Sequence, residues 1–162
     1  MKPLALAIGL VALAACGPSP LTGGHPSADS LARAALDALA RSDRESLHAL
    51  ALSEQEFRNH VWPELPAARP ERNLPFSYVW GDLRQKSETS LVGTLAEHGG
   101  RRYVLQKVAF DGQPTEYPGF RVHRDAVLIV KDETGITRDI RICGSLFEKD
   151  GRWKIFSYVV ED

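Results

Sequence analysis

Apolar residues recur every three or four positions through the first half of the chain, and this period predicts amphipathic helices. A first helix is expected to begin at the N-cap Ser27, with Asp29 in its first turn, and to run to about Ser42. Ser42 or Asp43 then caps a short second helix. The segment Ser53-Glu-Gln-Glu56 matches a capping box and predicts the start of a third helix.

A longer helix is expected after a proline-rich loop. Pro66 and Pro70 are expected to keep that loop extended, and Pro75 fits the first turn of the helix that follows. The helix ends at His98, because two glycines come next; an alternative interpretation breaks it near Gly93 into a helix and a strand. Its inward stripe consists of Phe76, Val79, Trp80, Leu83, Ser87, Leu91 and Leu95.

The second half of the chain reads as strands, because β-branched and aromatic residues become frequent after Arg101. Four segments are expected to be extended: 103–110, 121–131, 138–147 and 153–160. Between the last two, Lys149-Asp-Gly-Arg152 is a hairpin signal, since Asp-Gly tolerates the left-handed dihedrals of a two-residue turn. The pattern therefore predicts a long antiparallel meander.

The hairpin sets a register for the last two strands. One side pairs Glu148 with Trp153, Leu146 with Ile155, Gly144 with Ser157 and Ile142 with Val159; the other pairs Phe147 with Lys154, Ser145 with Phe156, Cys143 with Tyr158 and Arg141 with Val160. The first side is expected to be core under the helices. Its small neighbours Gly144 and Ser157 indicate either a closely approaching helix or a cavity. The second side is too apolar for solvent alone, so a further layer or a homodimer partner is expected to cover it.

Composition limits the class of protein. The chain has 162 residues, which suits one domain, and a formal charge of −1. It has no basic excess with which to bind a phosphate backbone, so nucleic acid is not an expected partner. All 13 aromatic residues lie at Phe57 or later, which sets the first part of the chain apart.

That first part has the features of an export signal. Lys2 gives a positive start, and the 12 apolar residues 4–15 are about half of the roughly 20 needed to span a bilayer. The segment Leu13-Ala14-Ala15-Cys16 resembles the lipobox of bacterial lipoproteins. The resemblance implies that the preceding peptide is removed and that Cys16 carries the lipid. The alternative is an ordinary signal peptide in which the cysteine is incidental.

The lipobox resemblance divides the chain into a signal peptide (1–15), a lipidated cysteine with a flexible tether (16–27) and a single α+β domain (28–162). Proline and glycine punctuate the tether, in which we interpret His25 as an incidental polar residue. Gly17, in place of an aspartate, favours the outer membrane, with the domain facing the periplasm. Cys143 is then the only other cysteine, and it is expected to be a small buried hydrophobe.

The closing hairpin carries a second resemblance. A helical layer followed by an antiparallel meander that ends on Asp150-Gly-Arg-Trp153 resembles the nuclear transport factor two-like superfamily, which includes ketosteroid isomerase and polyketide-cyclase relatives. The resemblance implies a cone-shaped α+β fold, with N-terminal helices packed on a curved, mostly antiparallel sheet and a cavity between them. A cystatin-like domain is the nearest competitor, but it has one helix where this sequence predicts at least three.

Enzymes of that superfamily place a carboxylate or histidine beside tyrosine-type donors in the cavity. The side chains that could take such roles, none of them within a motif of a catalytic member, are His60, Tyr78, Asp82, Tyr103, His123, Asp139 and Arg141. Strand alternation places Arg121, His123 and Asp125 on one face, where they either converge on an anion or pair as an exposed strand end. Asp139 and Arg141 likewise share a face and can pair across strands.

Other chemistry has little support in the sequence. The five histidines lack the spacing of metal ligands, and neither a phosphate loop nor a nucleophile elbow is present, so no metal or cofactor is expected. The favoured function is a non-catalytic, membrane-tethered domain that binds a small apolar ligand or an envelope protein. The alternative is a small cofactor-independent isomerase or cyclase that uses His60, Tyr103 or His123 in the cavity.

Replacing Cys16 with serine tests the lipid anchor. Palmitate labelling is expected to be abolished, and the protein is expected to move from the membrane to the soluble fraction, because stable anchoring needs two or more acyl chains. Metabolic labelling with fractionation measures both changes. Cys143→Ser is the matched control, and labelling that survives Cys16→Ser contradicts the assignment.

Overall fold

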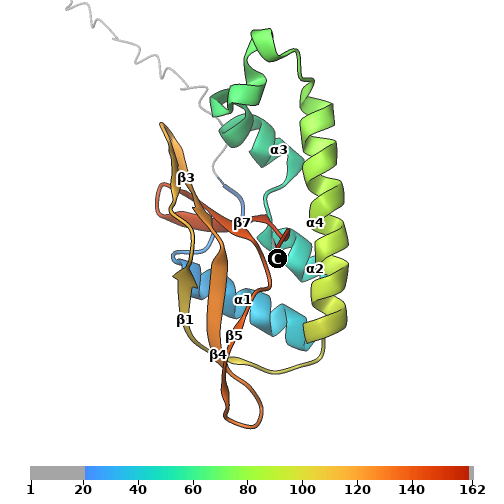
Figure 1. Ribbon diagram of the computed structural model, residues 1–162, viewed down its shortest axis with the longest axis vertical. Helices are drawn as coiled ribbons and strands as arrows, with labels where there is room; N and C mark the ends of the chain where they lie inside the picture. The colour runs from blue at the N-terminus through green and yellow to red at the C-terminus, as the bar shows by residue number, and fades with distance from the viewer. Residues whose placement is uncertain (1–20, 161–162) are drawn as a thin grey trace, which may run out of the picture.

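The computed structural model describes residues 21–160 and has an α+β architecture (Figure 1). The expected signal peptide, the lipobox with Cys16, and residues 17–20 of the tether lie outside the described residues. The α-helices are α1 (Ala28–Ala40), α2 (Arg44–Leu50), α3 (Glu54–Glu56) and α4 (Phe76–His98). The strands are β1 (Val104–Phe110), β2 (Thr115–Tyr117), β3 (Phe120–Arg124), β4 (Ala126–Lys131), β5 (Thr137–Ile140), β6 (Ser145–Lys149) and β7 (Arg152–Ser157).

The helix starts follow the capping residues in the sequence. Ser27 and Asp43 accept backbone N–H groups at the starts of α1 and α2. At α3 both bonds of the capping box form: the Ser53 hydroxyl accepts the Glu56 N–H, and the Glu56 carboxylate accepts the Ser53 N–H. The chain then continues through a π turn (Phe57–Val61) rather than a regular helix. None of the helices within residues 21–160 is long and apolar enough to cross a membrane.

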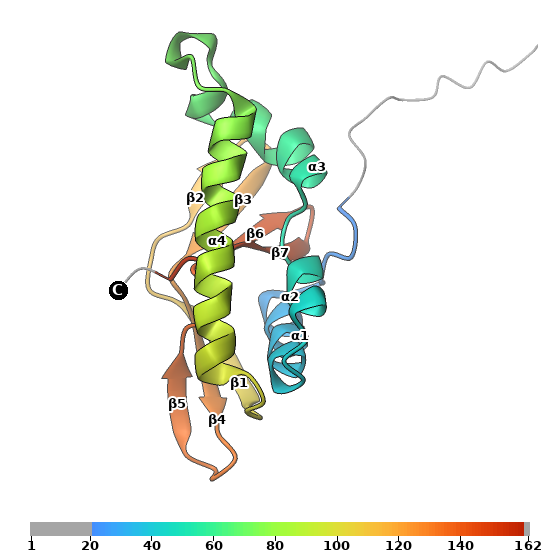
Figure 2. The same cartoon turned by 90° about the vertical axis from the view of Figure 1, so that its right-hand side faces the viewer.

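The loop before α4 and the helix itself differ from the prediction in detail. Pro66 and Pro70 do not keep the loop extended, because each begins a short 3-10 turn, where a missing N–H costs nothing. Pro75 is the residue before the helix and not part of its first turn. α4 is continuous through Gly93, so the alternative with a break there is wrong. It runs along the long axis of the molecule (Figures 1 and 2).

The strands form two antiparallel sheets, ordered β1-β4-β5 and β2-β3-β6-β7. The segments 121–131 and 138–147, each expected to be one strand, are both divided between the sheets. Asp125 breaks the first with a φ of 55°. The segment 138–147 is broken by an additional residue. Ile140 pairs with Leu128 and Ser145 with Arg124, so five positions on this segment lie opposite four on its partner. Such a bulge bends a strand, and a period-2 pattern does not reveal it.

The β6–β7 hairpin has the predicted register near its turn, where Glu148 pairs with Trp153 and Leu146 with Ile155. The register then shifts, so that Ser145 pairs with Ser157 instead of Phe156, and the ladder ends there. The expected pair of Gly144 with Ser157 and the expected pairs of 141–143 with 158–160 are therefore wrong. At this point the Gly144 N–H donates to the Ser157 carbonyl.

Two apolar clusters lie on opposite faces of the four-stranded sheet. One joins Leu146 and Ile155 to α1, Leu91 of α4 and the three-stranded sheet. The other joins Phe147 to residues around the π turn and the first turns of α4, including Phe57. Phe147 is fully buried, so the second face is covered by a further layer of the same chain, which is one of the two covers expected.

A buried ion pair lies within this second layer. The Lys154 ammonium donates to both Glu56 carboxylate oxygens, at 3.1 and 2.8 Å, and the side chains are only 4% and 8% exposed. Burial alone would raise the pKa of Glu56, but hydrogen bonds from Lys154, Ser53 and Thr22 outweigh it and hold the pKa below its ordinary value. The Glu56 carboxylate therefore stays ionised inside the domain.

Residues expected to belong to the flexible tether are attached to the domain. The Thr22 N–H donates to Glu56 at 2.8 Å, and the Lys154 ammonium donates to the Thr22 carbonyl at 3.0 Å. His25 exchanges two backbone hydrogen bonds with Trp153, so it is a pairing residue and not an incidental one. Thr22 and His25 are thus part of the folded domain.

Lys154→Met should leave Glu56 buried without its cation. Removing one partner of a buried pair typically costs about 3–5 kcal/mol, so the free energy of unfolding is expected to fall by this amount. Chemical denaturation measures the loss.

Two variants serve as controls for that loss. Lys86→Met breaks the exposed Asp82–Lys86 pair and is expected to change stability little. Glu56→Leu combined with Lys154→Met is expected to recover most of the loss, because no charge is then buried alone. A Lys154→Met protein as stable as Lys86→Met would contradict the assigned role of the pair.

Candidate functional site

A cleft lies between α4 and the four-stranded sheet, where the sequence predicted a cavity between helices and sheet. We call it the helix–sheet cleft; its volume is 510 Å³, and it is lined by Phe57, Leu65, Val79, Asp82, Leu83, Lys86, Thr115, Tyr117, Val122, Arg124, Asp125, Gly144, Ser145, Phe156, Ser157 and Val159. Its volume is within the range of small-molecule sites. The cleft is thus the most direct structural candidate for ligand binding.

The cleft exists because small residues meet at the bend of the sheet. Gly144 and Ser157 both line it, although Ser157 pairs with Ser145 and not with Gly144 as expected. The backbone after β7 crosses Gly144 closely. A Cβ atom on Gly144 would lie 1.7 Å from the Val159 carbonyl oxygen, so only glycine fits there.

The cleft combines apolar walls with a charged rim. Phe57, Phe156 and Tyr117 supply aromatic surface from three different elements. On α4, the Lys86 ammonium donates to the Asp82 carboxylate at 2.8 Å, and both side chains are more than half exposed. Arg124 and Asp125 add a cation and an anion where the sheet bends. This arrangement suits a molecule with an apolar body and a polar end.

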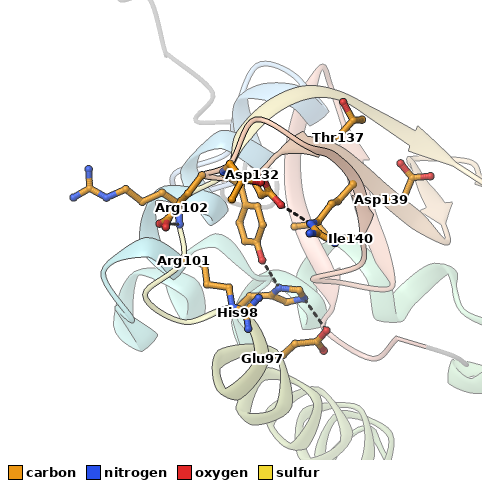
Figure 3. Close-up of a pocket in the computed structure, with 12 residues that line it drawn as sticks. Glu97, His98, Arg101, Arg102, Asp132, Thr137, Asp139 and Ile140 are labelled. Carbon is orange, nitrogen blue, oxygen red and sulfur yellow. Dashed lines mark hydrogen bonds and ion pairs between the residues drawn. The ribbon is translucent and has the colours of Figure 1, made fainter.

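A second depression, larger at 770 Å³, lies between the C-terminus of α4 and the β4–β5 hairpin (Figure 3). We call it the hairpin depression; Tyr103 and Asp139, two of the candidates from sequence, line it. The Tyr103 hydroxyl lies 3.0 Å from Nδ1 of His98, whose ring is buried. Asp139, however, points away from His98 (Figure 3), so the three groups do not converge.

Most polar groups of the hairpin depression hold the fold together. The Asp132 carboxylate accepts the N–H groups of Thr134 and Ile136 and the Arg138 guanidinium. The Thr134 hydroxyl also donates to this carboxylate. The bonds from the Thr134 hydroxyl and from Arg138 contribute most to holding the pKa of Asp132 well below its usual range. The Glu133 carboxylate accepts the Arg102 N–H, which attaches the preceding connection to the hairpin. We therefore regard this depression as structural despite its greater volume.

The remaining candidates lie apart from one another. His60 lies in the π turn and lines a third pocket together with Leu21. Tyr78 is 66% exposed on α4. Arg141 pairs with Asp111 on the β1–β2 connection.

His123 belongs to a paired strand rather than to a converging face. Its Nε2 lies 2.7 Å from the Glu148 carboxylate, and its ring packs on Phe110 and Trp153. Arg121 also approaches Glu148, at 3.9 Å. Asp125 lies at the bend and lines the helix–sheet cleft, so the alternation that placed it beside His123 does not extend that far.

None of the six candidates other than Asp82 lines the helix–sheet cleft. Phe57, Tyr117 and Arg124 were missed as site residues because they come from the π turn, the short strand β2 and the bend at Asp125, which have no periodic signal. The one usable signal was the Gly144–Ser157 pair. Cys143 is a buried thiol, as expected, and burial raises its pKa to about 12.

Comparison with known proteins adds no family or function. No protein-family model matches the chain, and neither the curated proteins nor the solved structures contain a significant match. Within residues 21–160, no group of three or more histidine, cysteine, aspartate or glutamate side chains could hold a metal ion. The site must therefore be interpreted from its own geometry.

His98 predicts a pH dependence of stability. Burial of the ring holds the pKa of His98 below the ordinary value of 6.5. The negative charge of Glu97 raises this pKa, and the positive charge of Arg101 lowers it, but both effects are smaller than that of burial. As the pH falls, the unfolded chain takes up a proton before the folded one does, so the free energy of unfolding should decrease below about pH 6.5. In His98→Gln this part of the decrease should disappear, as measured by urea unfolding across pH.

Tyr103→Phe is the control for this measurement, because it removes the hydroxyl partner and keeps the buried imidazole. Its stability should still decrease on acidification, since burial is the main cause of the shift. A residual slope is expected in all variants from His25, whose pKa is also lowered by burial. A His98→Gln protein with the same slope as the parent would contradict the prediction.

Proposed function

We propose that the protein is a bacterial lipoprotein whose domain binds a small amphipathic molecule in the helix–sheet cleft without transforming it. The observation that carries the proposal is the composition of the cleft: aromatic walls and a charged rim, without a histidine. In this proposal Cys16 is acylated, and the domain lies outside the cytoplasm, facing the periplasm from the outer membrane. The domain belongs to the nuclear transport factor two-like cone folds.

The membrane part of the proposal rests on the sequence. A short apolar segment that ends in Leu13-Ala14-Ala15-Cys16 is what a lipobox requires. Acyl chains attached to Cys16 would hold the domain at the membrane without a membrane-spanning helix. The fold part rests on the helices that pack against bent antiparallel sheets and on the cleft between them.

Binding is favoured over catalysis because the histidines and the tyrosine that the alternative enzyme would use do not line the cleft. The alternative enzyme required His60, Tyr103 or His123 in the cavity between helices and sheet. His60 and Tyr103 line other pockets, and His123 is bonded to Glu148. A ligand in the cleft would instead meet the Asp82–Lys86 pair, Arg124 and Asp125, which suit recognition of a polar end. Concavity favours a small ligand over an envelope protein.

Filling the cleft tests the proposal. Val79 lines it from α4, and Val79→Trp should weaken the binding of an amphipathic fluorescent probe, anilinonaphthalene sulfonate, by about tenfold, equivalent to 1.4 kcal/mol. Fluorescence titration of the purified protein measures the dissociation constant.

Val92→Trp is the matched control, because Val92 is 52% exposed on the same helix and does not line the cleft. It should bind the probe as the parent does, and circular dichroism should show that both variants are folded. Equal binding by Val79→Trp and Val92→Trp would exclude the cleft as the binding site.

A further inference from the structure

The described chain begins at a fixed place on the domain. Thr22 is bonded through its N–H to Glu56 and through its carbonyl to Lys154, and both partners are buried. Three residues later, His25 pairs with Trp153 on the edge strand β7. The described chain therefore begins at one defined point, between α3 and the β6–β7 hairpin (Figure 1).

This attachment leaves a short connection to the proposed lipid anchor. Only four residues, Gly-Pro-Ser-Pro, separate Cys16 from Leu21. Five Cα–Cα steps span at most about 18 Å, whatever their conformation. By comparison, the 23 residues of α4 extend over about 34 Å. An anchor at Cys16 must therefore keep the Leu21 side of the domain near the membrane surface.

The surface at this point is a pocket of 650 Å³, which we call the tether pocket. It is lined by Leu21, Gly23, Gly24, His60, Lys149, Asp150 and Arg152. The cations Lys149 and Arg152 donate to the carbonyls of Gly119 and Gly24, neither of which carries charge. With one carboxylate, that of Asp150, the pocket has a positive balance that a phosphate group could complement.

Resting on the proposed lipid anchor, we propose that the tether pocket lies against the phospholipid headgroups of the membrane that holds the protein. The short connection sets this orientation, and Lys149 and Arg152 face lipid phosphates. The β4–β5 hairpin, at the far end of the molecule in both views (Figures 1 and 2), is held away from the bilayer. The domain thus presents a defined face to solvent.

Fluorescence quenching of the acylated full chain tests this orientation. A probe is attached through Arg152→Cys at the tether pocket or, as the matched control, through Ile136→Cys, which is 55% exposed in the β4–β5 turn. The native Cys143 is only 3% exposed and should not react. The proteins are reconstituted in phosphatidylethanolamine–phosphatidylglycerol vesicles that carry a headgroup-linked nitroxide quencher.

Quenching at position 152 is expected to exceed that at position 136 by roughly twofold or more, because of the limited reach of the connection. Equal quenching, or stronger quenching at position 136, would overturn the orientation. Inserting ten Gly/Ser residues after Pro18 should reduce the difference, and a difference unchanged by the insertion would overturn the argument from tether length.

Acylation is measured first in the same samples. If the parent takes up no more palmitate than Cys16→Ser, the lipoprotein proposal fails, and the orientation fails with it. If the parent is acylated and the two probes are quenched alike, only the orientation fails.

Discussion

The buried Glu56–Lys154 pair is the interaction on which the arrangement of the domain depends. Its two charges come from α3 and β7, and the backbone of Thr22 is bonded to both. A charge removed from water must keep its partner, so these three segments cannot separate independently. The capping box orients the carboxylate, since Ser53 donates to the same oxygen as Lys154. The Glu56 side chain thus takes part both in the local capping box and in the long-range ion pair.

The pair lies on one of the two covered faces of the four-stranded sheet. Lys154 shares a face with Phe147, and the π turn and α4 cover that face, while α1 covers the other. The sheet is therefore a middle layer, and elements within residues 21–160 pack on both of its faces. Where it bends, at Asp125 and Gly144, the layer above it opens into the helix–sheet cleft.

The sequence located structural elements better than it located the site. Ser27, Asp43 and Ser53 marked helix starts, and Asp150-Gly151 marked the hairpin with its first pairs. The candidates for chemistry were chosen by residue type, and the fold separates them into different pockets and strand pairs. Their separation follows from the different elements that carry them, such as the π turn for His60, α4 for Tyr78 and β3 for His123.

By itself, the sequence determined the α+β class and the features that act over a few residues, namely the helix caps and the Asp-Gly turn. These depend on local backbone geometry and on the short-range period of apolar residues. The tertiary structure alone decided that Thr22 and His25 belong to the domain, that Glu56 and Lys154 meet, and that small residues at Gly144 and Ser157 leave a cleft. Each of these results depends on contacts between distant segments, for which a single sequence carries no periodic signal.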